Sequence, residues 1–199
     1  EIGDGHLTHE MAHLFTAPFG KGILRLAGGT GIFPNIGMVE GIATAAAWDS
    51  QIMTYHGWTA ALVQLDMLPQ LEEVLEPTGF WARQSRTVYT MMGSFSRWLI
   101  DAQGMESFRQ LYASGDYEGI YGQPLAALVD HWRDFLDEIE VSDYQLSMAR
   151  YRFERPTIFE RRCARSLAER SDEAATLSVS QRYQEASDCM ATVVEDDPH

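Results

Sequence analysis

Apolar residues at helical spacing are the feature that most restricts how this chain folds. The segment QPLAALVDHWRDFLDEI, residues 123–139, places its apolar residues on one stripe of a helix, and Pro124 stands in the first turn, where proline is tolerated. Residues 85–103 and 105–114 also read as helices, and no clear run has the two-residue period of a strand. The sequence therefore predicts a mainly α fold, a helical bundle. The stripe consists of Leu125, Leu128, Val129, Trp132, Phe135, Leu136 and Ile139.

Breaks between helices suggest how the chain is organised. A first helix is expected from Asp4 or Thr8 to about Phe15, followed by the glycine- and proline-rich residues 17–35. A second helix is expected from about Asn35, and shorter pieces at 57–66 and 69–76. Beyond about residue 140 aromatic residues thin out and charge rises, so we place a domain boundary near Pro156, between residues 1–155 and 156–199.

Composition excludes some classes of partner. The 199 residues carry a formal net charge of −14, which argues against nucleic acid and anionic membrane surfaces. No apolar run of about 18 residues is present, so we expect no transmembrane segment. The two cysteines, Cys163 and Cys189, either pair in an oxidising compartment or remain thiols. They stand far from any histidine pair, which argues against a zinc site with cysteine ligands.

The heptapeptide LTHEMAH, residues 7–13, carries the pattern of a zinc site. On a helix His9 and His13 lie one turn apart, with roughly 6 Å between their Cβ atoms, so two imidazole nitrogens can converge on one ion. Glu10 is rotated by about 100° and can reach a water without being a ligand. Two nitrogen ligands, an open position and a nearby carboxylate are what zinc-dependent hydrolysis needs. The alternative is a structural helix that carries two histidines.

Glu40 is the best candidate for a third ligand. It stands alone in the apolar segment GMVEGIATAAAW, where a carboxylate is costly unless it is paired or bound to metal. Gly37 and Gly41 on either side permit a neighbouring helix to approach closely.

The combination of LTHEMAH and GMVEGIAT resembles the gluzincin zinc metallopeptidases, which include the M1-type aminopeptidases and the peptidase-MA-like domains. The resemblance covers roughly residues 6–140. It implies that His9, His13 and Glu40 bind Zn²⁺ and that Glu10 is the general base that activates water. It also implies that Tyr89, in YTMMGSFSRWLIDAQ, donates a hydrogen bond to the oxyanion. The alternative for Tyr89 is a core residue on a buried helix.

The sequence departs from the family pattern in its spacing and in its start. The gap between His13 and Glu40 is longer than usual because of the glycine-rich loop, and Tyr89 precedes Gly93 by one position more than in M1 enzymes. Because the motif follows Glu1 so closely, we expect a piece of a longer protein whose β-sheet, with the strand that binds peptide backbone, lies upstream.

The tail from residue 157 resembles one tetratricopeptide-type helical hairpin. The segment RYQEASDCMATVVEDDP has the Y-x-x-A and closing D-P of the second helix of such a repeat. Stable arrays need about three repeats, so further repeats are expected beyond it. The alternative is an unrelated hairpin packed on the domain.

Two functions follow from these patterns. The first is a zinc metallopeptidase that hydrolyses a peptide or protein substrate, expected in an extracytoplasmic (periplasmic or secreted) location. The second is an inactive zincin-derived module that binds a protein partner through residues 157–199.

The remaining histidines and aromatic residues receive structural interpretations. We expect His6 and His131 at the surface and His56 at the start of a helix. Residues 18–34 either line the cleft or form a flexible insert. An aromatic set is expected in the core: Phe80, Trp81, Phe95, Trp98 and Trp132.

Overall fold

The protein is mainly helical, as the sequence predicted. The computed structural model describes residues 4–21, 25–28, 34–48, 52–82, 85–154 and 164–196, and these form no sheet. Their only bridge of β type is an isolated antiparallel pair, Lys21 and Leu26. The helices are α1 (Asp4–Thr16), the 3₁₀ turn η1 (Ala17–Phe19), α2 (Ile36–Ala46), α3 (Tyr55–Gln64), α4 (Leu71–Val74), α5 (Ser85–Gln103), α6 (Met105–Ser114), α7 (Tyr117–Tyr121), α8 (Leu125–Asp137), α9 (Asp143–Phe153), α10 (Ala164–Val179) and α11 (Tyr183–Asp196).

The chain divides into two compact units, Glu1–Phe153 and Glu154–His199. Pro156, where the sequence suggested a boundary, lies outside the described residues, as does Cys163. No helix among the residues described is both long and apolar enough to cross a membrane.

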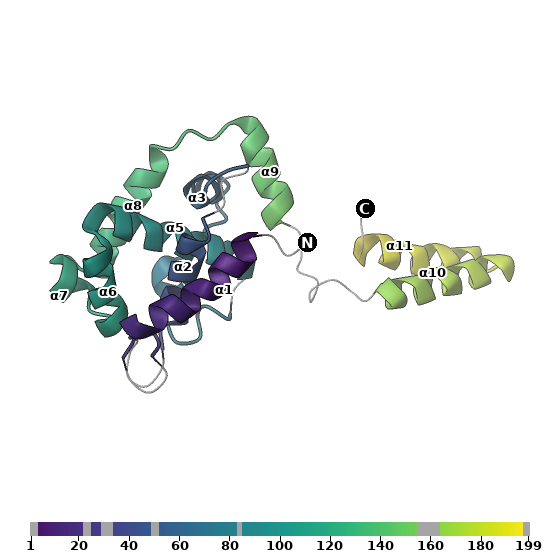
Figure 1. Cartoon of the computed structure of the whole chain (residues 1–199). Coiled ribbons are helices and arrows are strands. Elements are labelled where there is room, and N and C mark those ends of the chain that lie inside the picture. Colours follow the sequence, from purple (N-terminus) through teal and green to yellow (C-terminus); the bar gives the residue numbers. More distant parts are fainter. Residues whose placement is uncertain are drawn as a thin grey trace. The chain divides into compact units, whose positions relative to one another are not determined.

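Helix α5 forms the centre of the first unit, with α2, α3 and α6 packed against it (Figure 1). Its inward side chains are completely buried, and this burial of apolar surface is the main driving force for the unit. These side chains are Val88, Met91, Met92, Phe95 and Leu99.

Helix α8 closes this core with the stripe that its sequence predicted. Leu128, Val129, Trp132 and Leu136 are buried, and the other members of the stripe pack against them. The Trp132 indole lies 5.4 Å from the ring of Phe95 in a T-shaped arrangement. Its Nε1 donates a hydrogen bond to Ser94 Oγ at 3.2 Å, so the one polar atom of the ring is satisfied inside the core.

The prediction that Trp81 belongs to the core is wrong. Its side chain is 68% exposed, whereas Phe80, beside it in the chain, is buried. Both residues lie in the turns after α4, where only one of two consecutive side chains points inward. Trp98 is half-buried, and Phe95 and Trp132 are buried as expected.

The second unit is a hairpin of α10 and α11, which lie side by side (Figure 1). Among its described side chains only Ala174 and Ala186 are buried. Cys189 is a free thiol whose Sγ lies 3.4 Å from the carbonyl oxygen of Arg170 on the facing helix.

Candidate metal centre

Helix α1 presents its two histidines on the side that faces the protein. Ala12 and Thr16 are buried on this side, and the Thr16 hydroxyl donates to the carbonyl oxygen of Ala12 at 2.8 Å. His9 and His13 stand beside them, with their side chains 17% and 27% exposed. The helical spacing of four residues therefore brings both imidazoles to one half-buried region, open enough to admit solvent.

Helix α2 supplies the carboxylate. Its first turn is capped by Asn35, whose side chain accepts a hydrogen bond from the backbone nitrogen of Met38 at 3.0 Å. Nearly every other residue of this helix is buried and apolar or small. The Glu40 side chain is only 16% exposed and reaches out toward α1, as the sequence predicted for a carboxylate that needs a partner.

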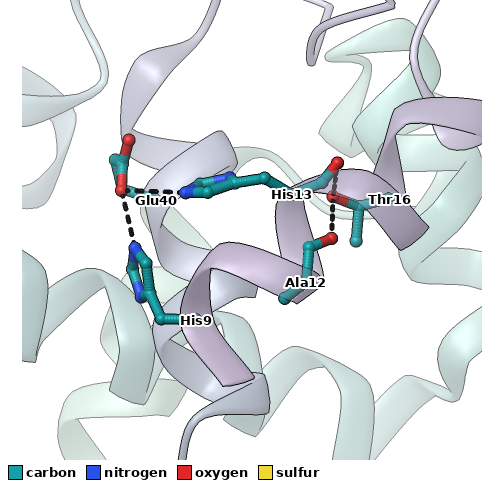
Figure 2. Close-up of polar contacts among 5 residues, drawn as sticks. All are labelled: His9, Ala12, His13, Thr16 and Glu40. Carbon is teal, nitrogen blue, oxygen red and sulfur yellow. Dashed lines mark hydrogen bonds and ion pairs between the residues drawn. The ribbon is translucent and has the colours of Figure 1, made fainter. Parts of the chain in front are cut away.

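The three side chains converge on one point (Figure 2). Glu40 Oε2 lies 3.2 Å from His9 Nε2 and 3.6 Å from His13 Nε2. The imidazole rings stand nearly perpendicular, with their centroids 4.9 Å apart. One ligand atom from each residue lies within 4.8 Å of the others.

This geometry fits a zinc ion. At bond lengths of about 2.0–2.2 Å, two ligand atoms of a tetrahedral zinc site lie about 3.3–3.6 Å apart. The two distances from Glu40 Oε2, 3.2 and 3.6 Å, agree with that separation. A hydrogen bond explains the distance of 3.2 Å but not that of 3.6 Å, which is beyond the usual range of hydrogen bonds. Two nitrogen ligands and one oxygen ligand also leave a fourth position for water or substrate.

Glu10 is placed beside this centre without joining it. It follows His9 on α1, and its side chain is exposed to solvent. Its negative charge contributes to the raised pKa of Tyr89, so the carboxylate lies near the phenol.

Tyr89, on α5, also lies beside the centre. Its ring centroid lies 6.0 Å from that of His9 and 5.2 Å from that of Phe80. Burial, together with the charge and hydrogen bonding of Glu40 and the charge of Glu10, raises the pKa of Tyr89 to about 12. The phenol is therefore protonated at neutral pH and serves as a hydrogen-bond donor.

The other histidines take no part in the centre. His6 and His131 are exposed, as expected. His56 lies in the first turn of α3, where its Nδ1 is 2.9 Å from Ser94 Oγ and its ring packs between Trp48 and Phe135. Burial lowers the pKa of His56 to about 4, so its ring is neutral at pH 7.

The described part of the glycine-rich loop is attached to α6. Phe19 packs against Tyr112, with ring centroids 6.2 Å apart, and Gly28 donates its backbone N–H to the Tyr112 carbonyl oxygen at 2.7 Å. Residues 22–24 and 29–33 lie outside the described residues, so the two interpretations of the loop stay open.

Sequence reasoning missed two groups near the centre. It assigned Phe80 to the core without relating it to Tyr89, although the centroids of the two rings lie 5.2 Å apart. It also related Gly93 of MMGSFS only to the spacing of the family pattern and not to close helix packing, which glycine permits.

Comparisons of this chain with models of protein families, with curated proteins and with solved structures gave no match. The assignment of a function therefore depends on the geometry and chemistry of the site.

Proposed function

We propose that this protein is a zinc-dependent peptidase that hydrolyses peptide bonds, in line with the resemblance of its motifs to the gluzincins. The convergence of His9, His13 and Glu40 carries the proposal. Two imidazoles and one carboxylate match the ligand types of catalytic zinc sites. A purely structural role for the two histidines explains less well why the half-buried carboxylate of Glu40 faces both of their rings.

The side chains around the centre divide the work of hydrolysis. His9, His13 and Glu40 would hold the zinc ion, which would supply a Lewis acid to polarise a carbonyl group and to lower the pKa of water. Glu10 accepts the proton of the attacking water and passes it to the leaving amine. The Tyr89 phenol donates a hydrogen bond to the oxygen that becomes negative as the carbonyl carbon turns tetrahedral.

The metal is tested first, by native mass spectrometry of the purified chain after zinc supplementation at neutral pH. We expect about one zinc ion per chain, and Glu40→Ala is expected to weaken zinc binding by at least about 100-fold, because loss of a supporting hydrogen bond alone costs 10–100-fold. Glu118→Ala, on the exposed face of α7, is the matched control and should bind like the wild type. A wild-type chain that takes up no zinc would contradict the proposal.

The chemistry is tested with Glu10→Gln on a peptide library. The amide keeps the shape of the side chain but does not accept the proton, so hydrolysis is expected to fall about 10²–10⁴-fold while zinc is retained. Glu118→Gln is the control for loss of one surface charge. Full activity of the Glu10→Gln protein would exclude this carboxylate as the base.

A second candidate function is protein binding through the hairpin. It is favoured by the large apolar side chains that α10 and α11 expose, among them Val179, Tyr183 and Met190. A zinc-loaded wild-type chain that cleaves no member of a diverse peptide library would make this the leading candidate.

A further inference from the structure

Helices α2 and α5 approach each other so closely that one position on α2 has no room for a side chain. A methyl group added at Gly41 would stand 2.4 Å from Ser96 Oγ and 2.9 Å from the carbonyl oxygen of Met92. The second of these is backbone, which does not yield by a change of rotamer. Any side chain at this position therefore requires the two helices to move apart.

Helix α5 likewise has a position, Gly93, where α2 leaves no room for a side chain. A methyl group at Gly93 on α5 would stand 2.5 Å from Thr44 Cγ2 and 3.0 Å from Thr44 Cβ. Each helix thus places a glycine against the other. The hydroxyl oxygens of Thr44 and Ser96 are buried at this crossing and have no hydrogen-bond partner among the described residues. Because unsatisfied buried hydroxyls reduce stability, their presence indicates that small size is what this crossing requires.

The crossing adjoins the residues of the metal centre. Glu40 directly precedes Gly41 on α2, and Tyr89 lies one helical turn before Gly93 on α5. Helix α1, with both histidines, packs against α2, and α2 packs against α5. The distance from Tyr89 to His9 and Glu40 therefore depends on how closely α5 lies to α2.

We propose that the Gly41–Gly93 crossing positions Tyr89, setting the distance of its phenol from the proposed metal ligands. This inference deepens the proposed peptidase function and rests on it for its catalytic consequence. Gly41, Gly93, Thr44 and Ser96 are positioning residues, because they act through Tyr89 and contact no substrate.

A methyl group at position 93 changes the position of Tyr89 without changing the proposed metal site. It pushes α5 from α2 by a fraction of an ångström up to about 1 Å, while the ligands on α1 and α2 stay together. Since a misplacement of about 1 Å can cost 100-fold in rate, Gly93→Ala is expected to keep zinc and KM but to lower kcat about 10–100-fold.

The experiment uses the full chain in four forms. These are the wild type, Gly93→Ala, Gly93→Ala with Thr44→Ala, and Gly57→Ala. In the double variant the nearest atom, Thr44 Cγ2, is gone and the closest remaining contact is Thr44 Cβ at 3.0 Å, so kcat should recover in part. Gly57→Ala is the control, because its added methyl meets nothing closer than 3.4 Å, an ordinary contact, in the buried helix α3.

A direct measurement of position accompanies the kinetics. Nuclear Overhauser effects between the ring protons of Tyr89 and His9 report their proximity whether or not the protein is active. We expect these signals in the wild type and in Gly57→Ala, a marked weakening in Gly93→Ala, and a partial return in the double variant. A merely structural role for Gly93 would lower stability without this graded series.

The outcomes separate the two proposals. A wild type without zinc and without turnover refutes the peptidase, and the ring-proton signals alone then decide the positioning role. Unchanged signals and kcat in Gly93→Ala overturn the inference, as does a double variant no closer to wild type than Gly93→Ala. If Gly93→Ala does not fold, a fifth form, Thr44→Ala alone, decides it by comparison with the double variant: signals weaker in the double variant than in Thr44→Ala are expected, and equal signals overturn the inference.

Discussion

The helices around α5 and the hairpin of α10 and α11 bury very different kinds of side chain. In the first unit, α5 alone carries two methionines, a phenylalanine, a valine and a leucine whose side chains are fully buried. In the hairpin the buried side chains among the described residues are two alanines, and Val179 is 85% exposed. Both regions are helical and contain apolar residues, so helix formation is not what separates them.

The difference lies in the number of layers. A helix with neighbours on several sides, such as α5 with α2, α3 and α6, can surround a large side chain. A pair of helices has only one shared face, so its largest apolar residues remain at the surface. Glu40 on α2 and Tyr89 on α5 lie on helices with more than one neighbour, an arrangement that fixes side chains through packing, and α1 packs its histidines against α2.

The largest effect on stability is expected from a cavity in the core of the first unit. Trp132 is fully buried and its indole is hydrogen-bonded to Ser94. Trp132→Ala is expected to lower the free energy of unfolding by about 3–5 kcal/mol, because it removes the ring and leaves a cavity. Urea unfolding followed by circular dichroism measures the change.

Trp81→Ala is the matched control, since it removes the same side chain from the surface. Its effect should stay within about 1 kcal/mol. Equal losses for the two tryptophans would mean that burial does not govern the stability of this unit.

The stability of the first unit is expected to depend on pH through the half-buried ring of His56. Burial lowers the pKa of His56 from 6.5 to about 4, with the charge of Asp101 opposing and that of Arg97 assisting. In the unfolded chain the ring regains its ordinary pKa, so the unfolded state binds more protons between pH 6.5 and 4. The stabilisation is therefore complete above pH 6.5 and is lost as the pH falls toward 4. We expect a loss of about 1–2 kcal/mol, discounted because the ring is partly exposed.

The measurement compares urea midpoints at pH 7.5 and pH 5 for the wild type and His56→Gln. Carboxylates titrate in both proteins, so the difference between them isolates the imidazole. Identical losses of stability in the two proteins would show that His56 is not responsible.

The smallest effect is expected in the hairpin. Ala174→Gly removes the methyl group of one of the two alanines buried among the hairpin's described side chains and weakens the helix, at a cost of about 1 kcal/mol. Amide hydrogen exchange in α10 and α11 should become faster, while exchange in α5 stays slow. Val179→Ser, at an exposed position, is the control and should change nothing beyond about 0.5 kcal/mol. Slower exchange in α5 than in the hairpin is expected even in the wild type, and the reverse order would contradict the comparison.

Local patterns predicted the helices well. The first helix, the long helix at residues 85–103 and the stripe of α8 were placed from spacing and from glycine and proline, because helix formation depends on neighbours within one or two turns. The short helix α7 was not predicted as a separate element. It begins after the N-cap Asp116 and ends before Gly122, whose φ angle is in the left-handed region. Asp and Gly at such positions are equally common in loops, so they did not predict a helix.

Burial was harder to predict where no helix imposes a period. Phe80 and Trp81 are consecutive aromatic residues, and composition alone assigns both to the core. The turn after α4 directs one inward and the other to solvent, and this depends on what packs against the turn.

The sequence by itself determined that His9 and His13 share one face of a helix, because four residues make one turn. It also marked Glu40 as a carboxylate in need of a partner, because the helix around it is apolar. Only the tertiary structure decided that the partner is the histidine pair, and that Tyr89 reaches the same place. These contacts join residues 31 and 80 positions apart, and they exist because α1 packs on α2 and α2 lies against α5 with glycine on both sides. No local spacing specifies the distance between two helices, because that distance is set by the volumes of all the side chains between them.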